Sequence, residues 1–370
     1  MTKGHVENAP DKVKAFVECF SHTPVQVLIE NLITQVEYAE IDGRAFPLTV
    51  NEVRAPGNCY ICNPVTGYVD YALDETRNFA ASPVLQRMVN GVIRAAAPLV
   101  RATGLDHVVH VNNWLFSTNP VPDLDGQVAA EIRDQLVAHY PNLAIVLRSL
   151  NTIADPVSIA ACRAAGCRLL PSRQIYIFDP RAQPATMTKA MKQDRAKLRN
   201  TPYHLAENHT FSEPDYTRCA ELYDLLYLQK YTHLNPQYSA EYIAQMHHRG
   251  LIELMGLRDD QGRLVAVTGL FENGNTLTQP IVGYDTTLPR GDGLYRMVMA
   301  MGQDRAIKRN LFFNMSAGAA DFKRRRGALP AIEYSAVYTG HLSLRRRLAT
   351  RWVEMLLRHI GVPLLQRFEL

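Results

Sequence analysis

The feature that most constrains the fold is a fixed order of strands and helices between Leu264 and Tyr338. Strand-like apolar runs follow one another closely, and Asp260-Gln-Gly262 and Asn273-Gly274 between them are typical turn sequences. Helical and strand segments then alternate to the end of the stretch. The expected strands are 251–259, 263–273, 275–285, 311–316 and 331–339, and the expected helices are 293–310 and 319–326.

The first half of the chain alternates between the same two kinds of segment. We expect strands at 26–33, 36–43, 44–54, 107–116, 143–150 and 173–179, and helices at 83–103, 127–140 and 155–165. Alternation of this kind predicts an α/β fold. At 370 residues the chain is long enough for two hydrophobic cores, and the composition changes at Pro180-Arg-Ala-Gln-Pro184. The sequence therefore predicts two domains, 1–183 and 184–370.

Composition excludes several classes of protein. With 47% apolar and 21% charged residues, the chain is neither fibrous nor disordered. The first residues have no apolar core of a signal peptide, and the apolar segments elsewhere are broken short of a bilayer's thickness. We therefore expect a cytoplasmic protein without a membrane span. The segment 344–357 is a basic amphipathic helix, which either packs on the domain or touches a membrane surface.

Cysteines and charge give no sign of a metal or of a nucleic acid. Cys59 and Cys62 form a CxxC pair, but a structural zinc site needs a second pair or histidines at ligand spacing, so we expect no metal. Six cysteines in a chain of this length fit a reducing compartment. The net charge of +4 is modest, although basic residues cluster at 189–199, 323–326 and 345–347.

A glycine-rich turn, Arg290-Gly291-Asp292-Gly293, stands between an expected strand and an expected helix that begins at Leu294. Such a turn leaves several backbone N–H groups unpaired at the helix N-terminus, where the helix dipole also favours an anion. The turn therefore indicates a phosphate or pyrophosphate site. A tight connection without a ligand is the alternative.

The element order and two motifs resemble acetyltransferases of the GNAT fold. In that family the glycine-rich turn holds the pyrophosphate of coenzyme A. Many members also carry N-x-x-A-x-x-x-Y-x-x-x-G-F near the last helix, and Ser316, Ala319, Lys323 and Gly327 fall on its positions here. Lysine thus replaces the tyrosine that acts as an acid toward the leaving thiolate.

A Phe-Lys pair before a glycine is similar to Fem-type aminoacyltransferases and to cellulose-biosynthesis-like acetyltransferases, and Phe322-Lys323 stands before Gly327 in this way. This resemblance implies two tandem GNAT-like domains, each a mixed, mostly antiparallel sheet flanked by helices. The first domain would be degenerate. A lysine near the reacting carbonyl can stabilise negative charge on the carbonyl oxygen and on the leaving group, so Lys323 is a candidate catalytic residue.

The resemblance also implies donor-binding residues. Arg326 could pair with the donor's phosphates. The whole expected set is Arg290, Gly291, Asp292, Gly293, Leu294, Ser316 and Arg326. Fem-like proteins open this domain with a basic helix of pattern K-x-x-R-x-x-x-R, which Lys192, Arg195 and Arg199 fit. These charges are expected on one face of the helix. That face either binds a phosphorylated or carboxylated substrate or is simply exposed to solvent.

Candidate acceptor-binding residues come from the loop 231–238, between expected helices at 214–230 and 240–249, and from the expected strands 275–285 and 331–339. His233 is a candidate base because histidine titrates near neutral pH, and Asp285 is a competing base or ammonium anchor. Tyr334 is a candidate cavity residue, although tyrosines in strands are often core. The remaining candidates are Tyr231, Asn235, Tyr238 and Tyr284.

The sequence contains neither a Gly-x-Ser-x-Gly elbow nor a cysteine beside a histidine, so it does not indicate a covalent nucleophile. The leading hypothesis is an N-acyltransferase in which the amine of a small polar acceptor attacks a thioester donor directly, within a ternary complex. The donor would be acyl-coenzyme A or an acyl-carrier protein, with no permanently bound cofactor and a monomeric or homodimeric chain. The alternatives are a Fem-type enzyme that uses aminoacyl-tRNA and a non-catalytic, ligand-binding GNAT scaffold.

Overall fold

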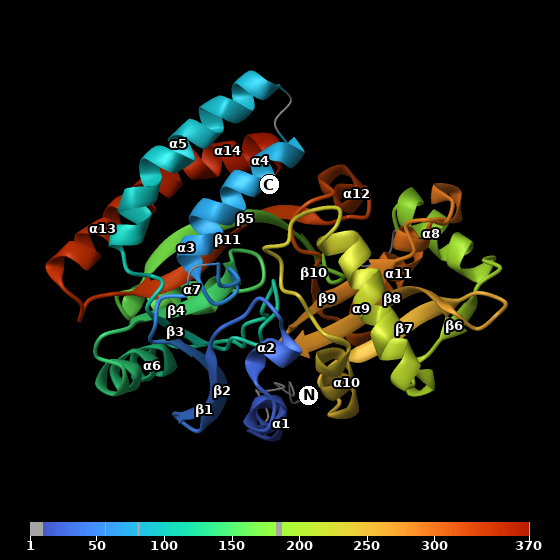
Figure 1. Cartoon of the computed structure of the whole chain (residues 1–370), viewed down its shortest axis with the longest axis horizontal. Helices are drawn as coiled ribbons and strands as arrows, with labels where there is room; N and C mark the ends of the chain where they lie inside the picture. Colours follow the sequence, from blue (N-terminus) through green and yellow to red (C-terminus); the bar gives the residue numbers. More distant parts are fainter. Residues whose placement is uncertain (1–9, 56, 80–81, 183–186, 370) are drawn as a thin grey trace.

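The computed structural model describes residues 10–55, 57–79, 82–182 and 187–369. One sheet of eleven strands runs through the whole molecule in the order β1-β2-β3-β4-β11-β5-β10-β9-β8-β7-β6 (Figure 1). Its strands are β1 (Gln35–Ile41), β2 (Arg44–Asn51), β3 (Val108–Val111), β4 (Ala144–Asn151), β5 (Arg168–Phe178), β6 (His204–Ala206), β7 (Glu253–Arg258), β8 (Leu264–Asn273), β9 (Thr276–Tyr284), β10 (Phe312–Asn314) and β11 (Leu329–Tyr338).

Helices cover both faces of the N-terminal half of this sheet. The strand β4 is buried on both sides: Ala144 and Val146 pack with the cluster that includes α5 and α13, whereas Ile145 and Leu147 pack with α6 and α7. The helices packed around this half are α1 (Pro10–Ser21), α2 (Val25–Leu28), α3 (Pro64–Thr66), α4 (Ala72–Phe79), α5 (Pro83–Ala102), α6 (Gly126–His139), α7 (Pro156–Ala164), α13 (Leu344–Leu356) and α14 (Val362–Phe368), with single π-helical turns η1 (Gly67–Tyr71) and η4 (Leu357–Gly361).

The C-terminal half has the same layered construction. Strands β6 to β9 pair antiparallel, and β9 pairs in parallel with β10 across the helix α11 (Leu294–Arg309). Helices α9 (Glu213–Tyr227) and α10 (Ala240–His248) pack on one face, and α11 packs on the other. The remaining elements are α8 (Lys189–Arg199), α12 (Ala320–Arg324) and the 3-10 turns η2 (Asn208–Thr210) and η3 (Arg290–Asp292).

The two halves exchange strands at the centre of the sheet. In the N-terminal half, β4 pairs with β11 from the other end of the chain, so β11 separates β4 from β5. In the C-terminal half, β10 pairs with β5. Each half is therefore completed by a strand of the other, and the two cannot separate without breaking the sheet.

The structure confirms a mixed, mostly antiparallel sheet flanked by helices. The sequence predicted one sheet for each domain, whereas the structure has a single continuous sheet. The predicted boundary between residues 183 and 184 lies outside the described residues, so the division into two domains stays a prediction. Residues 1–9, on which the expectation about a signal peptide partly rests, lie outside them as well. Among the described residues, no helix combines the length and the apolar character needed to cross a bilayer.

The strand expected at 26–33 is wrong. Residues Val25 to Leu28 form the short helix α2, which begins directly after Pro24. Val25, Leu28 and Ile29 are buried in the core that both halves share, so the apolar run reflects burial rather than strand pairing. Proline fits the start of a helix because it has no N–H to leave unpaired.

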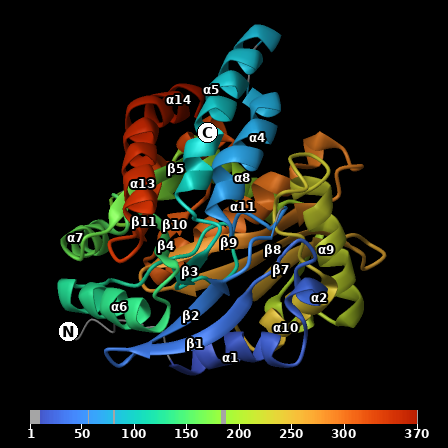
Figure 2. The ribbon, with the colours of Figure 1, turned by 60° about the vertical axis from the view of Figure 1, so that its left-hand side comes forward.

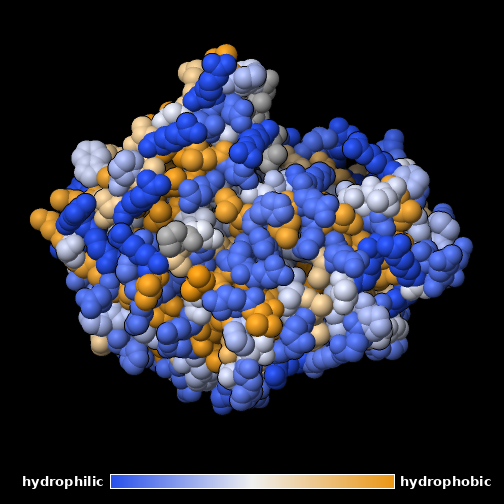
Figure 3. All heavy atoms as spheres, viewed as in Figure 1, coloured by the Kyte–Doolittle hydropathy of each residue, from blue (hydrophilic) through white to orange (hydrophobic). Residues whose placement is uncertain are grey.

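The basic C-terminal helix packs on the N-terminal half, as Figures 1 and 2 show for α13 beside α5. Ala349, Thr350 and Val353 of α13 are buried, whereas Leu348 and Trp352 on its other side are exposed. On the face drawn in Figure 3, apolar atoms are scattered among hydrophilic ones.

An aromatic cluster also joins the two halves beneath the sheet. The ring of Trp114 lies 5.1 Å from that of Phe16 and 5.0 Å from that of Phe271, between centroids. The Tyr238 hydroxyl donates a hydrogen bond of 2.9 Å to the Leu115 carbonyl. This cluster and the exchanged strands place the two halves in a fixed relation.

Because β11 is buried between β4 and β5, we expect Val337→Ala to destabilise the whole chain by about 2 kcal/mol. Scanning calorimetry should show one unfolding transition, shifted to lower temperature, for both halves together. Val157→Ala, at a residue 55% exposed on α7, is the matched control and should shift the transition little. Two separate transitions, with only one shifted, would contradict the exchange of strands.

Candidate functional site

A cavity opens where the parallel strands β9 and β10 diverge. Phe312–Asn314 of β10 pair with Thr276–Thr278, the first residues of β9, and β10 then ends while β9 continues to Tyr284. The cavity has a volume of about 130 Å³. Residues of the C-terminal half that line it are Leu226, Tyr227, Tyr231, Asn235, Thr278, Gln279, Pro280, Val282, Tyr295, Met299, Lys323 and Asn314 to Ala319.

The N-terminal half closes the cavity from the other side. Arg173 reaches it from β5, the strand that pairs with β10, and Ser117 and Thr118 come from the loop after β3. The remaining lining residues of this half are Tyr60, Tyr71 and Glu75. The cavity is thus a property of the assembled sheet, and neither half encloses it alone.

Lys323 lines this cavity from α12 and is almost completely buried. Its amino group donates hydrogen bonds of 3.1 Å to the Ser316 carbonyl and 2.7 Å to the Ala317 carbonyl. Burial, together with the positive charge of Arg173, lowers the pKa of Lys323 from 10.5 to about 7. The side chain therefore changes its charge near neutral pH.

The loop that Lys323 holds is conformationally unusual. Ser316 and Ala319 have φ angles of 60° and 50°, in the left-handed region that non-glycine residues rarely adopt. The Asn314 side chain accepts a hydrogen bond of 2.9 Å from the Ser316 backbone, which supports the same conformation. Strain held in this way is found at functional sites, where the surrounding structure maintains it.

A buried ion pair lies beside Lys323. The Arg173 guanidinium donates to Glu333 of β11 at 2.9 Å and also to the Ser117 carbonyl at 2.7 Å and the Thr118 hydroxyl at 2.8 Å. Two buried charges are stable in the sheet only when they are paired and hydrogen-bonded in this way. The pair fixes the position of Arg173 in the cavity wall, between the two halves.

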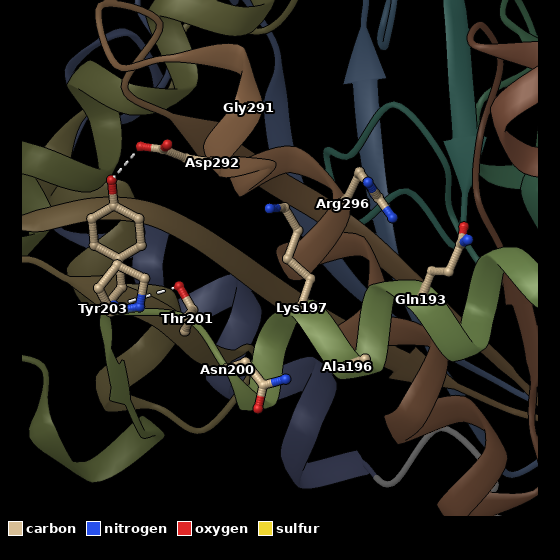
Figure 4. A pocket seen from close by; sticks show the side chains of 10 residues that line it. Gln193, Ala196, Lys197, Asn200, Thr201, Tyr203, Gly291, Asp292 and Arg296 are labelled. Carbon is tan, nitrogen blue, oxygen red and sulfur yellow. Dashed lines mark hydrogen bonds between the residues drawn. The ribbon is translucent and has the colours of Figure 1, made fainter.

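A second hollow, a groove, lies at the glycine-rich turn. Gly291 and Asp292 line it on one side, and Lys197 of α8 lines it on the other (Figure 4). The Tyr203 hydroxyl donates a hydrogen bond of 2.6 Å to Asp292. The other lining residues are Gln193, Ala196, Asn200, Thr201, Pro202, Tyr203 and Arg296.

Gly293 is required at the turn for two reasons. Its φ of 69° lies in the left-handed region, and a Cβ atom there would lie 2.4 Å from Cε of Lys197. Gly293 is also the N-cap of α11, and because it has no side chain, no side-chain cap pairs with the backbone N–H groups of the first turn. The structure thus brings a helix N-terminus and a lysine together.

The basic helix α8 is held in place by ion pairs. The buried Asp194 accepts hydrogen bonds from both Arg296 of α11 and Arg326, and Arg195 pairs with Asp304. Lys192 and Arg199 are exposed and line neither hollow. Arg195 and Arg326 therefore bind helices together here, and Lys197 is the basic residue of α8 that faces the turn.

The structure brings four of the predicted site residues together in the cavity, namely Lys323, Ser316, Tyr231 and Asn235, and it places Gly291 and Asp292 in the groove. The other predicted residues line neither hollow. Leu294 and Tyr238 are buried in the core, Tyr284 and Tyr334 pack against core clusters, and Arg290 and His233 are exposed.

Asp285, the expected base, lies outside the cavity. Its carboxylate pairs with Arg218 at 2.6 Å and accepts a hydrogen bond of 2.6 Å from the Thr287 hydroxyl. Burial raises the pKa of Asp285, but these hydrogen bonds outweigh burial and lower the pKa below its usual value. The carboxylate is thus held ionised in a structural ion pair.

Sequence reasoning missed most of the cavity's polar wall. Glu75, Tyr60 and Tyr71 belong to a segment with no recognisable motif, and only tertiary structure brings it to β9 and β10. Arg173 did leave a signal, because a charged residue stands there within an apolar strand. A buried charge of this kind needs a partner and often marks a site.

Comparison with known proteins identifies the C-terminal half. A family model described as acetyltransferase (GNAT) domain matches residues 189–324, from α8 to the end of α12. No curated protein matches the chain. The expected GNAT-superfamily relationship is therefore confirmed for the region that carries the groove and Lys323.

Three solved structures are similar to this chain at low sequence identity. FemX is 8% identical with a TM-score of 0.51, and the similarity covers 90% of this chain and 97% of FemX. L-PGS from Bacillus licheniformis is 14% identical over 95% of this chain and 99% of its own, with a TM-score of 0.49. A tandem GNAT protein from the clavulanic acid biosynthesis pathway is 14% identical over 62% and 75%, with a TM-score of 0.34. At 8% identity, the similarity to FemX concerns the fold alone.

The lowered pKa of Lys323 has a measurable effect on stability. Because the folded pKa of about 7 lies below the unfolded value of 10.5, the unfolded chain binds more protons between these two values. The stability of the wild-type protein relative to Lys323→Met should therefore rise as pH increases from about 7 to 10. Denaturant unfolding of both proteins across this range measures the difference. A pH-independent difference would contradict the buried, lowered pKa.

Proposed function

We propose that this acyltransferase, whose residues 189–324 form a GNAT acetyltransferase domain, transfers an acyl group from a thioester donor to the amine of a small polar acceptor. The donor is acyl-coenzyme A or an acyl-carrier protein. The observation that carries the proposal is the position of Lys323, a buried amino group in the cavity where β9 and β10 of that domain diverge.

The donor's phosphates belong in the groove at the glycine-rich turn. Unpaired N–H groups at the start of α11 and the helix dipole favour an anion there, and Lys197 adds a positive charge. From this turn the acyl end extends along α11 to the cavity, because Tyr295 and Met299 of α11 line the cavity while Arg296 lines the groove. The helix α11 therefore contacts the donor at its phosphate end and at its acyl end.

The chemistry is direct attack in a ternary complex. The acceptor nitrogen forms the new C–N bond with the thioester carbonyl carbon, the C–S bond breaks, the amine loses one proton and the leaving thiolate gains one. In its protonated state Lys323 stabilises the carbonyl oxygen and the thiolate as negative charge develops on them. No cysteine or histidine is among the described residues that line the cavity, which favours direct attack over a covalent intermediate.

Binding and turnover test the proposal. Acetyl-coenzyme A and its longer-chain thioesters should raise the melting temperature, and Lys323→Ala should lower kcat at least tenfold with little change in donor affinity. If no thioester binds and the protein instead retains aminoacyl-tRNA, the proposed donor is wrong. If Lys323→Ala turns over at the wild-type rate, the role of this lysine is wrong.

The turn offers a second prediction, with a matched control. Gly293→Ala adds a Cβ atom that collides with Lys197 and strains a φ of 69°, so thioester affinity should fall about tenfold. Gly43→Ala imposes similar strain at a φ of 70° in open space, in the turn between β1 and β2 at the opposite edge of the sheet. Calorimetric titration of both variants should show weaker binding in the first alone. Equal binding in the two variants would remove the turn from the donor site.

A further inference from the structure

Glu75 is a carboxylate in the cavity wall that forms no ion pair with any described residue. It lies on α4, and its neighbour Asp74 is neutralised by Arg77 at 3.0 Å. The nearest basic group that affects Glu75 is Arg173, which is already paired with Glu333 of β11 at 2.9 Å. The negative charge of Glu75 is therefore available to a ligand.

Four tyrosines line the same cavity as this carboxylate. The Tyr71 hydroxyl donates a hydrogen bond of 3.4 Å to the Asn235 side chain, and burial, together with the nearby Glu75 carboxylate, raises the pKa of that hydroxyl. The rings of Tyr60 and Tyr71 lie 4.7 Å apart between centroids. Burial raises the pKa of the Tyr231 hydroxyl, and the negative charge of Glu75 contributes to this effect. The ring centroids of Tyr227 and Tyr231 lie 6.3 Å apart.

A carboxylate among tyrosine rings favours a cation. The faces of aromatic rings carry partial negative charge and attract an ammonium group, most strongly where water is excluded. A neutral or anionic ligand would gain nothing from the charge of Glu75 and would leave it unpaired. The amine of an acceptor is protonated at neutral pH, so it arrives in the form that this wall can bind.

We propose that Glu75, with Tyr60, Tyr71, Tyr227 and Tyr231, binds the ammonium group of the acceptor and removes the proton that the amine must lose before it attacks. The acceptors are accordingly primary amines that enter the cavity as cations. One proton passes from R–NH3⁺ to the carboxylate, which leaves R–NH2 and a neutral glutamic acid, and the proton then goes to solvent. This inference rests on the proposed function and assigns its acceptor subsite to the N-terminal half.

Arg173 lines the cavity together with Glu75 and Lys323. Its positive charge acts to lower the pKa of each of them. Burial raises the pKa of Glu75, and the Tyr71 hydroxyl and the charge of Arg173 oppose this effect. A raised pKa suits a group that accepts a proton near neutral pH.

Propylammonium and its neutral analogue 1-propanol are suitable probes, with binding followed by ligand-observed NMR on the full chain. We expect the wild-type protein to bind propylammonium at least tenfold more tightly than 1-propanol. Glu75→Gln should remove this preference, whereas Asp74→Asn, a matched loss of charge on the same helix, should keep it. Equal affinity of the wild-type protein for the two probes, or a preference retained in Glu75→Gln, would overturn the proposal.

The wild-type protein provides a second test if Glu75→Gln does not fold. Its affinity for propylammonium should fall as pH is lowered and Glu75 becomes protonated. Lys323 lines the same cavity and becomes charged as pH falls through about 7, so the titration is repeated on Lys323→Met, in which the fall in affinity must persist. Burial raises the pKa of Tyr71 well above 10, and the ion pair with Glu333 outweighs burial and raises the pKa of Arg173, so neither group changes its charge over pH 5 to 8. Constant affinity over this range would contradict a role for Glu75.

Failure of the subsite and failure of the proposed function are distinguishable. Acetyl-coenzyme A should raise the melting temperature of Glu75→Gln as it does that of the wild-type protein, because Glu75 is not in the donor groove. A protein that binds propylammonium through Glu75 but binds no thioester would refute the donor and keep the cation site. A protein that binds thioesters but shows no cation preference would refute the subsite alone.

Discussion

The pairing of β11 between β4 and β5 is the constraint on which the rest of the structure depends. It takes the last strand of the chain into the N-terminal half and leaves β5 to pair with β10. Because β10 is short, β9 diverges from it immediately beyond this pairing, and the space is closed by residues of both halves. The cavity follows from the strand order, and its two walls come from sequences far apart in the chain.

Buried charge is the second consequence of this arrangement. The sheet centre carries the Arg173–Glu333 pair and the amino group of Lys323 where a simple core would have apolar side chains. Taking charges out of water costs several kcal/mol, which pairing only partly offsets. The buried charges lie beside a cavity, and Ser316 and Ala319 nearby have left-handed backbone conformations. Stability alone favours neither feature, and both are typical of functional sites.

Local patterns predicted the elements better than they predicted the site. The start of α11 at the glycine-rich turn and that of α12 next to Ala319 could be predicted from local sequence, because each depends on a short continuous segment. The pairing of β5 with β10 could not, since strand periodicity carries no information about distant partners. For the same reason the sequence around Glu75 and Tyr71 does not indicate a site. Nor does the sequence show that Asp285 is paired with Arg218.

The central claim is that a thioester donor extends from the groove at the glycine-rich turn to the cavity, with its acyl end beside Lys323. A crystal structure of the protein with a non-hydrolysable thioether of coenzyme A tests it most directly. The account predicts phosphates at Gly291 to Leu294 near Lys197, and the acyl group in the cavity within reach of the Lys323 amino group. A thioether bound away from the divergence of β9 and β10, with the cavity empty, would contradict it.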